Sequence, residues 1–204
     1  MDLDNCRGKN IEVIKYFLKK YRKIVFFSLI VILGVLFSWF IYLDSARMEQ
    51  KNISKAYMNV ITLPEPLNAN AETKIKSFIH ANKNSEYSVL AALKSAKLQI
   101  EALNLPKALS ELQWAKANTR DSLLKSIISY RLARIQTEQR NFDSAIMELE
   151  NIKDISWKSR VKELHGDIFL GKGDRGAAYE MYRKAQSLGG MNPILKMKLD
   201  DLAK

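Results

Sequence analysis

The sequence predicts an all-α protein in which a single N-terminal transmembrane helix is followed by a solenoid of helical hairpins. Residues 24–43 form an uncharged, apolar run. From residue 71 onward, apolar side chains recur at the three- and four-residue spacing of amphipathic helices. Small residues recur within those helices at intervals of 37 and 33 residues, and a period of this size is typical of stacked hairpins.

The apolar run IVFFSLIVILGVLFSWFIYL is long enough to cross a membrane. A helix of this length spans about 30 Å, which is the thickness of the hydrocarbon core of a bilayer. Trp39 and Tyr42 lie near its C-terminal end, where amphipathic rings favour the membrane interface. The alternatives are a buried core helix, which normally keeps a polar stripe, and a cleaved signal peptide, which normally has a shorter run and a small-residue cleavage site. We expect a transmembrane helix that contacts the lipid bilayer through residues 24–43.

Basic residues are concentrated on the N-terminal side of this run. Six Lys or Arg residues stand in the fifteen residues before it and three in the fifteen after it. Because the side richer in Lys and Arg stays in the cytoplasm, we expect residues 1–23 to be a cytoplasmic basic N-terminus and the C-terminal domain to be exported. Residues 11–23 either lie along anionic headgroups or form a solvated flank. The only cysteine, Cys6, is on the reducing side, which agrees with an exported part that has no disulfides.

The net charge of +11 does not indicate nucleic-acid binding. Residues 44–204 hold 26 basic and 19 acidic residues, but the basic residues are scattered and no basic stretch is interleaved with aromatic residues. Lysine supplies 23 of the 33 basic residues, so compositional drift toward lysine is one explanation of the charge and a functional role is the other. We expect no nucleic acid among the partners.

Proline, glycine and asparagine mark the ends of the expected helices. Residues 44–70 form a juxtamembrane helix and the linker LPEPLNANA, because Pro64 and Pro66 end the helix. Asn192 followed by Pro193 is a typical helix start. Short loops make neighbouring helices antiparallel. Further helices are expected over residues 71–82, 87–102, 105–118, 121–139, 142–152, 156–171, 174–188 and 192–203.

Paired small residues define the repeat. Three alanines are each followed by a large residue after four positions and preceded by another small residue twelve positions earlier. The pairs are Ala96 and Ala108, Ala133 and Ala145, and Gly166 and Ala178. Small residues on both helices of a pair let the backbones approach closely, which is the tetratricopeptide arrangement of about 34 residues per helix–turn–helix unit.

We therefore predict a tetratricopeptide-like repeat domain with a C-terminal capping helix over residues 71–204. The last helix, residues 192–203, alternates apolar and charged residues, which suits the cap that a solenoid needs on its last open face. Helices before Ala91 form a further, poorer unit. The alternative is an irregular helical bundle.

The sequence contains no motif that indicates catalysis. His80 and His165 are 85 residues apart, and neither stands in a pattern that binds metal. No nucleophile elbow, phosphate-binding loop or dinucleotide-binding motif is present. The LGKGD stretch at residues 170–174 reads as a helix C-cap followed by Asp174 as the next N-cap. We predict a protein that is not an enzyme and uses no cofactor or metal.

The concave face of the solenoid is the expected binding surface, because the first helix of each hairpin lines it. Residues three before, one after and four after each small residue lie toward this face. They are Leu93, Lys97 and Ile100; Tyr130, Arg134 and Thr137; and Glu163, Asp167 and Leu170, joined by Arg160. The candidate protein-binding residues are Lys97, Tyr130, Arg134, Arg160, Glu163 and Asp167. Their mixed character favours a protein or peptide ligand, and ordinary solvated positions are the alternative.

Several stretches resemble a known family. SARMEQKNISKAYMNVI follows the anchor, ANKNSEYSVLAAL opens the repeats, and RLARIQ and GDIFLGKGDRGAAYEMY form their core. With the basic N-terminus and the single anchor, they make the chain similar to the YfgM-like family of ancillary SecYEG translocon subunits of Gram-negative bacteria. The resemblance implies a single-pass inner-membrane protein with a periplasmic repeat domain. Its implied partners are the SecYEG translocon, the membrane-anchored periplasmic chaperone PpiD and exported client proteins.

The sequence is compatible with three functions. The resemblance implies transfer of newly exported proteins to periplasmic chaperones. An anchored tetratricopeptide scaffold for assembly of another cell-envelope complex is the alternative, and crosslinking to SecYEG separates the two. An envelope hydrolase would require a deep pocket with convergent polar groups.

Overall fold

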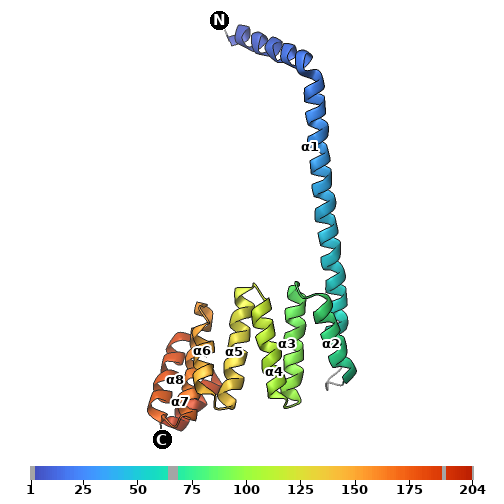
Figure 1. Cartoon of the computed structure of the whole chain (residues 1–204). Helices are drawn as coiled ribbons and strands as arrows, with labels where there is room; N and C mark the ends of the chain where they lie inside the picture. Colours follow the sequence, from blue (N-terminus) through green and yellow to red (C-terminus); the bar gives the residue numbers. More distant parts are fainter. Residues whose placement is uncertain (1–2, 64–68, 190–191, 204) are drawn as a thin grey trace. The chain divides into compact units, whose positions relative to one another are not determined.

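The computed structural model describes residues 3–63, 69–189 and 192–203, and these form α-helices, one short 3-10 helix and turns, with no strand among them (Figure 1). The chain divides into two compact units, Met1–Asn52 and Ile53–Lys204. The all-α class predicted from the sequence is confirmed. The linker predicted after Leu63 lies largely outside the described residues, since the description omits residues 64–68.

Helix α1 (Leu3–Ile61) contains the predicted membrane span. Within the described part of the chain, Phe26–Ile61 is the segment long and apolar enough to cross a membrane. Its large apolar side chains are exposed, with Phe27 and Tyr42 each 70% accessible. Exposed apolar surface of this extent requires a covering phase, and an apolar stretch without charges from residue 24 to 43 fits a membrane anchor.

The second unit is built from helical hairpins that follow one another along the chain (Figure 1). Helices α3 (Glu86–Glu101) and α4 (Leu105–Asn118) form one hairpin, α5 (Ser122–Glu138) and α6 (Phe142–Glu150) the next, and α7 (Lys158–Gly171) and α8 (Arg175–Gly189) the third. Helix α9 (Pro193–Leu202) packs on α8. The hairpins stack because each one buries its apolar stripe against the next.

The last turns of α1 share an apolar cluster with α2 (Ala69–Ala81) and α3. Val60 packs with Ile75 and Phe78 of α2 and with Leu98 of α3. Lys94 Nζ donates hydrogen bonds to the backbone carbonyls of Ile61 and, at 3.3 Å, Leu63. A cation at a helix C-terminus satisfies carbonyls that have no intrahelical partner. The further, poorer repeat unit expected before Ala91 stays a prediction.

The turns inside the three hairpins have the same geometry. Leu103, Arg140 and Gly173 lie at φ 59°, 61° and 87°, in the left-handed region. Each donates its N–H to the carbonyl three residues earlier, and the following residue donates to the carbonyl five earlier. These three turns are 37 and 33 residues apart, the same intervals as the small residues. The repeat inferred from alanines is therefore present in the backbone.

The small residues are buried where the helices of each hairpin cross. Ala96 is 1% exposed, and Ala108, Ala133, Ala145 and Ala178 are fully buried. Gly166 makes the tightest approach, because a Cβ atom built there would stand 2.3 Å from the ring of Tyr182 on α8. A side chain at residue 166 would therefore displace the largest fully buried side chain of the unit.

Two helix starts follow the predicted caps and two differ from the expectation, since α2 begins at Ala69, inside the predicted linker, and α7 begins later than residue 156. Asp174 Oδ1 accepts from the N–H of Ala177 at 2.8 Å, and Asn192 Oδ1 accepts from that of Leu195 at 2.7 Å. The helix expected from residue 156 is a 3-10 turn at Ile155–Trp157 before α7 begins at Lys158. The cause is Asp154, whose carboxylate accepts from the N–H of Ser156 and so starts a separate turn.

Candidate protein-binding groove

A groove of about 460 Å³ lies between α5 and α7, the first helices of two consecutive hairpins. It is open on one side and lined by both polar and apolar side chains. The lining residues are Arg134, Thr137, Glu138, Arg140, Phe142, Leu164, Asp167, Leu170 and Gly171. The groove lies where a solenoid presents its concave surface to ligands.

Phe142 and Gly171 shape one end of the groove. A Cβ atom at residue 171 would stand 2.8 Å from the Phe142 ring, so glycine lets that ring lie against the C-terminal end of α7. Lys172 Nζ lies 5.8 Å from the centre of the same ring and forms an ion pair with Asp143 at 3.2 Å. Leu170, 41% exposed, adds an apolar wall. This end of the groove can therefore accept an apolar side chain.

The structure brings some of the predicted binding residues together. Arg134 and Asp167 line the groove, as do Thr137 and Leu170 from the wider predicted set. Lys97 is exposed on α3, pairs with Glu101 at 3.4 Å and does not line the groove.

Two members of the wider set pack into the core. Leu93 is 8% exposed, and Ile100 packs against the same cluster of α3, α4 and α5. Their positions along the helix predict side chains that face the concave surface, but α3 packs closely against its neighbours and covers them instead. They have little surface left for a ligand.

Tyr130 and Arg160 belong to an aromatic cluster beside the groove. The rings of Tyr130 and Trp157 are 5.3 Å apart, and the Arg160 guanidinium lies 5.2 Å from the Trp157 ring. Burial raises the pKa of Tyr130, and the negative charge of Glu163 raises it further. The hydroxyl is therefore neutral at physiological pH, and the cluster offers stacking and hydrogen bonding rather than acid–base chemistry.

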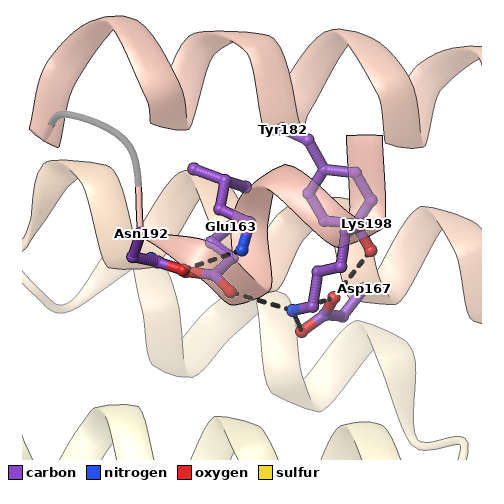
Figure 2. A network of polar contacts seen from close by, with 6 residues as sticks. Glu163, Asp167, Tyr182, Asn192 and Lys198 are labelled. Atoms are coloured by element: carbon purple, nitrogen blue, oxygen red, sulfur yellow. Dashed lines mark hydrogen bonds and ion pairs between the residues drawn. The ribbon is translucent and has the colours of Figure 1, made fainter. Parts of the chain in front are cut away.

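Glu163 and Asp167 are held by a lysine from α9 (Figure 2). Lys198 Nζ donates to Glu163 Oε1 at 2.9 Å and to Asp167 Oδ1 and Oδ2 at 2.7 and 2.9 Å. The hydroxyl of Tyr182 donates to Asp167 Oδ1 at 2.7 Å. The network therefore ties the groove to the capping helix and to the buried ring that packs on Gly166.

The pKa values of the network follow from this geometry. Burial lowers the pKa of Lys198, but the hydrogen bonds to Asp167 and Glu163 outweigh burial, and the net pKa is raised. Burial raises the pKa of Tyr182, and the hydrogen bond to Asp167 raises it further. Lys198 is thus charged and Tyr182 neutral at physiological pH, so the network is a fixed set of charges.

Lys198, Tyr182, Arg140 and Phe142 are not among the residues that the sequence predicts for this region. Lys198 follows Glu163 by 35 residues, which is close to one repeat period. Oppositely charged residues that stand one period apart in the sequence are therefore a signal from which this ion pair can be predicted. Arg140 lies in the turn between α5 and α6, and Phe142 is the first residue of α6, so neither lies on the predicted concave face of a first helix.

The arrangement supports binding rather than bond-making chemistry. Among the described residues, no group of three His, Cys, Asp or Glu side chains is placed to hold a metal ion. Burial lowers the pKa of His165, with a further contribution from Lys162, and the histidine does not line the groove. The groove offers guanidinium groups, carboxylates and an aromatic wall, which are the usual means of peptide recognition.

Comparison with known proteins gives consistent matches along the whole chain. A family model for the tetratricopeptide repeat-like domain matches residues 15–204. The chain is 30% identical to the ancillary SecYEG translocon subunit of Escherichia coli (strain K12) over the full length of both. It is 30% identical to that of Haemophilus influenzae and 28% to that of Aggregatibacter actinomycetemcomitans, covering 95% of this chain and 96% of the relative in each case. No solved structure matches.

Proposed function

The chain belongs to the family of ancillary SecYEG translocon subunits, which carry a tetratricopeptide repeat-like domain, and on this premise we propose that it is a membrane-anchored accessory protein of the SecYEG translocon. The family is one of protein-interaction proteins and not of enzymes. In this proposal, residues 24–43 span the bacterial inner membrane, and residues 1–23 lie in the cytoplasm. The second unit, Ile53–Lys204, which we call the hairpin unit, lies in the periplasm.

The observation that carries the proposal is the combination of an apolar anchor and an open groove in one chain. The groove between α5 and α7 presents Arg134, Phe142 and Leu170 on adjacent hairpins. A tethered site works at the effective concentration set by its tether, so modest intrinsic affinity is sufficient for segments that emerge nearby. The proposed role is to receive newly exported chains at the translocon exit.

The proposed second step is release to periplasmic chaperones, among them the membrane-anchored chaperone PpiD. Release requires weak binding, and a shallow groove without a covalent step provides it. The cycle needs no cofactor, because capture and release follow from non-covalent contacts alone.

Site-specific photo-crosslinking in intact cells tests this proposal. A crosslinking amino acid replaces Arg134 in the groove, and a matched control replaces Gln113, which is exposed on α4. We expect the probe at residue 134 to form adducts with nascent exported chains and periplasmic chaperones, and the probe at residue 113 to form fewer. A third probe at Trp39 reports the neighbours of the anchor, and SecYEG subunits are expected there.

Three results would contradict the proposal. Adducts with only an unrelated envelope complex would favour the scaffold alternative. Equal client adducts at residues 113 and 134 would remove the groove from the mechanism. Absence of SecYEG from all three probes would remove the translocon.

A further inference from the structure

We infer that the α5–α7 groove selects peptide segments that carry an aspartate or glutamate beside an aromatic or aliphatic side chain, and that Lys198 sets this preference. The inference rests on the proposed function, because it names the class of segment that the same groove would take. Its basis is that some charged side chains around the groove already form ion pairs or hydrogen bonds within the chain, whereas others are left to bind a ligand.

The groove is lined by four charged side chains, Arg134, Glu138, Arg140 and Asp167. Of these four, Asp167 alone has a side-chain ion pair or hydrogen bond to a described residue. Its two carboxylate oxygens accept three hydrogen bonds, two from Lys198 and one from Tyr182. Asp167 therefore has little capacity left to attract a cationic ligand.

The charged groups next to the lining are engaged as well. Glu163 accepts from Lys198, Arg160 lies over the Trp157 ring, and Lys172 pairs with Asp143. The side chains free to meet a ligand are thus two guanidinium groups, Arg134 and Arg140, and one carboxylate, Glu138.

Guanidinium groups favour a carboxylate partner. Their planar fork binds both oxygens of a carboxylate, and such charge-assisted pairs are stronger than neutral hydrogen bonds. Phe142 and Leu170 line the same groove and offer an apolar surface next to the two arginines, with the buried Leu164 behind them. A ligand that satisfies both features carries an acidic side chain close to an aromatic or aliphatic one.

The charge of the whole hairpin unit acts in the same direction. Residues 53–204 carry 24 basic and 17 acidic residues, so an acidic segment is attracted from a distance. The attraction is screened by salt, and the affinity for an acidic segment is expected to fall as ionic strength rises.

Lys198 does not line the groove, but it determines how much positive and negative charge the groove offers to a ligand. It comes from α9 and occupies the oxygens of both Glu163 and Asp167. Without that ammonium group, Glu163 would lose its ion pair with Lys198 and Asp167 would keep only the hydrogen bond from Tyr182. Both carboxylates could then attract a cationic ligand, and Asp167, which lines the groove together with Arg134, could pair with that arginine. Lys198 acts through these carboxylates, so it is a positioning residue for specificity and makes no direct contact with the ligand.

Peptide binding to the full-length protein in phosphatidylcholine nanodiscs tests the inference. Three fluorescein-labelled peptides share Gly-Ser flanks and a central Phe-Leu pair, which is bracketed by Asp and Glu, by Asn and Gln, or by two Lys. Fluorescence anisotropy measures their affinities. We expect the acidic peptide to bind about tenfold more tightly than the amide peptide, and the basic peptide to bind most weakly.

Arginine variants locate the preference. Arg134→Gln and Arg140→Gln are each expected to lower affinity for the acidic peptide about fivefold to tenfold and to leave the amide peptide unchanged. Arg183→Gln is the matched control, because Arg183 is exposed on α8 and lies outside the groove lining. An equal loss for the acidic and amide peptides would mean that the arginines only support the fold.

Lys198→Met tests the positioning role and keeps the apolar stem of the side chain. It is expected to reduce the preference for the acidic peptide, while Lys196→Met, exposed on the same helix, leaves it unchanged. Adding Glu163→Gln and Asp167→Asn to Lys198→Met removes the released carboxylates and is expected to restore the preference. Hydrogen exchange of α9 amides shows whether the cap remains docked, and a failure of this rescue with α9 docked would overturn the role of Lys198.

The outcomes separate this inference from the proposed function. Equal affinity for acidic and amide peptides overturns the inference, whereas client adducts at residue 134 would still support the translocon proposal. No binding of any peptide also overturns the inference. An acidic preference together with adducts from only an unrelated envelope complex would retain the inference and reject the translocon as the site of action.

Discussion

Leu103 holds a backbone conformation that glycine adopts at lower cost. It lies at φ 59° in the turn between α3 and α4, and its side chain is 86% exposed. A left-handed conformation costs a residue with a Cβ atom about 1 kcal/mol, whereas glycine adopts it freely and loses more backbone entropy on folding. We expect Leu103→Gly to raise the free energy of unfolding by about 0.5 kcal/mol, measured by urea unfolding with tryptophan fluorescence.

The control for that variant is an exposed position of ordinary helical geometry. Met147 is 66% exposed in the interior of α6, so Met147→Gly is expected to lower the free energy of unfolding by about 1 kcal/mol. Destabilisation by Leu103→Gly of the same size would show that the turn is not strained.

Gly166 is the position where one methyl group has the largest expected effect. The Cβ of Gly166→Ala would stand 2.3 Å from the Tyr182 ring, which is fully buried and hydrogen-bonded to Asp167. Forcing that ring aside costs on the order of 2 kcal/mol. We expect a clear fall in the urea midpoint of the hairpin unit.

Gly176→Ala is the matched control for Gly166→Ala. An added Cβ there meets only Asp174 Oδ1 at 3.7 Å, which is ordinary contact. Gly176→Ala is therefore expected to be neutral or to stabilise α8 by up to about 1 kcal/mol. If both alanines had the same effect, close packing at Gly166 would not be the cause.

At the scale of the element, cross-hairpin ion pairs link helices that do not follow each other in the chain. Glu72 on α2 binds Lys107 on α4 at 2.5 Å and Lys76 at 2.9 Å. The hydrogen bond from Lys107, with that from Lys76, lowers the pKa of Glu72 from 4.5 to about 2. A lowered carboxyl pKa gives stability that is present above the unfolded value and is lost as pH falls toward the folded value.

The pH dependence of Glu72→Gln checks this pair. The side chain is 23% exposed, so solvent screening reduces its contribution to about 1 kcal/mol. The variant is expected to be less stable than the parent at pH 7, and the difference is expected to shrink as pH falls below the unfolded pKa of 4.5 toward the folded pKa of about 2. Glu101→Gln is the control, since Glu101 and Lys97 are both well exposed and an exposed pair contributes little. A difference in stability that is as large at pH 2 as at pH 7 would assign the effect to packing.

The helix boundaries show which helix ends can be predicted from the neighbouring residues alone. Asp174 and Asn192 cap their helices as predicted, because capping depends on residues within one turn. The 3-10 turn at Ile155–Trp157 was missed, because Asp154 competes with the start of α7 over the same few residues. Leu103 and Arg140 were not recognised as turn residues, since left-handed geometry is usually signalled by glycine or asparagine.

At the scale of the whole molecule, the anchor and the hairpin unit make an orientation test possible. Cys6 is the chain's single cysteine and precedes the anchor. If the chain crosses the inner membrane as proposed, a membrane-impermeant maleimide applied to cells with a permeabilised outer membrane should label Gln113→Cys and leave Cys6 unlabelled until lysis. Labelling of Cys6 before lysis would place the N-terminus in the periplasm.

The candidate site was only partly accessible to sequence reasoning. The period identified Arg134 and Asp167, which line the groove, because each has a fixed place relative to a buried small residue. It did not identify Lys198, whose partners lie 31 and 35 residues earlier, because such pairing depends on how successive hairpins rotate against one another. Leu93 was assigned to the surface, although tertiary packing buries it.

The three left-handed turns also carry information about ancestry. Backbone geometry and hydrogen bonds are the same at residues 103, 140 and 173, yet the residues are leucine, arginine and glycine. If the hairpins arose by duplication of one unit with glycine in this turn, two of the three copies have since lost the glycine but kept the left-handed conformation. Homologous units in other genomes should then be recognised more reliably by aligning backbone torsions than by searching for a glycine at this position.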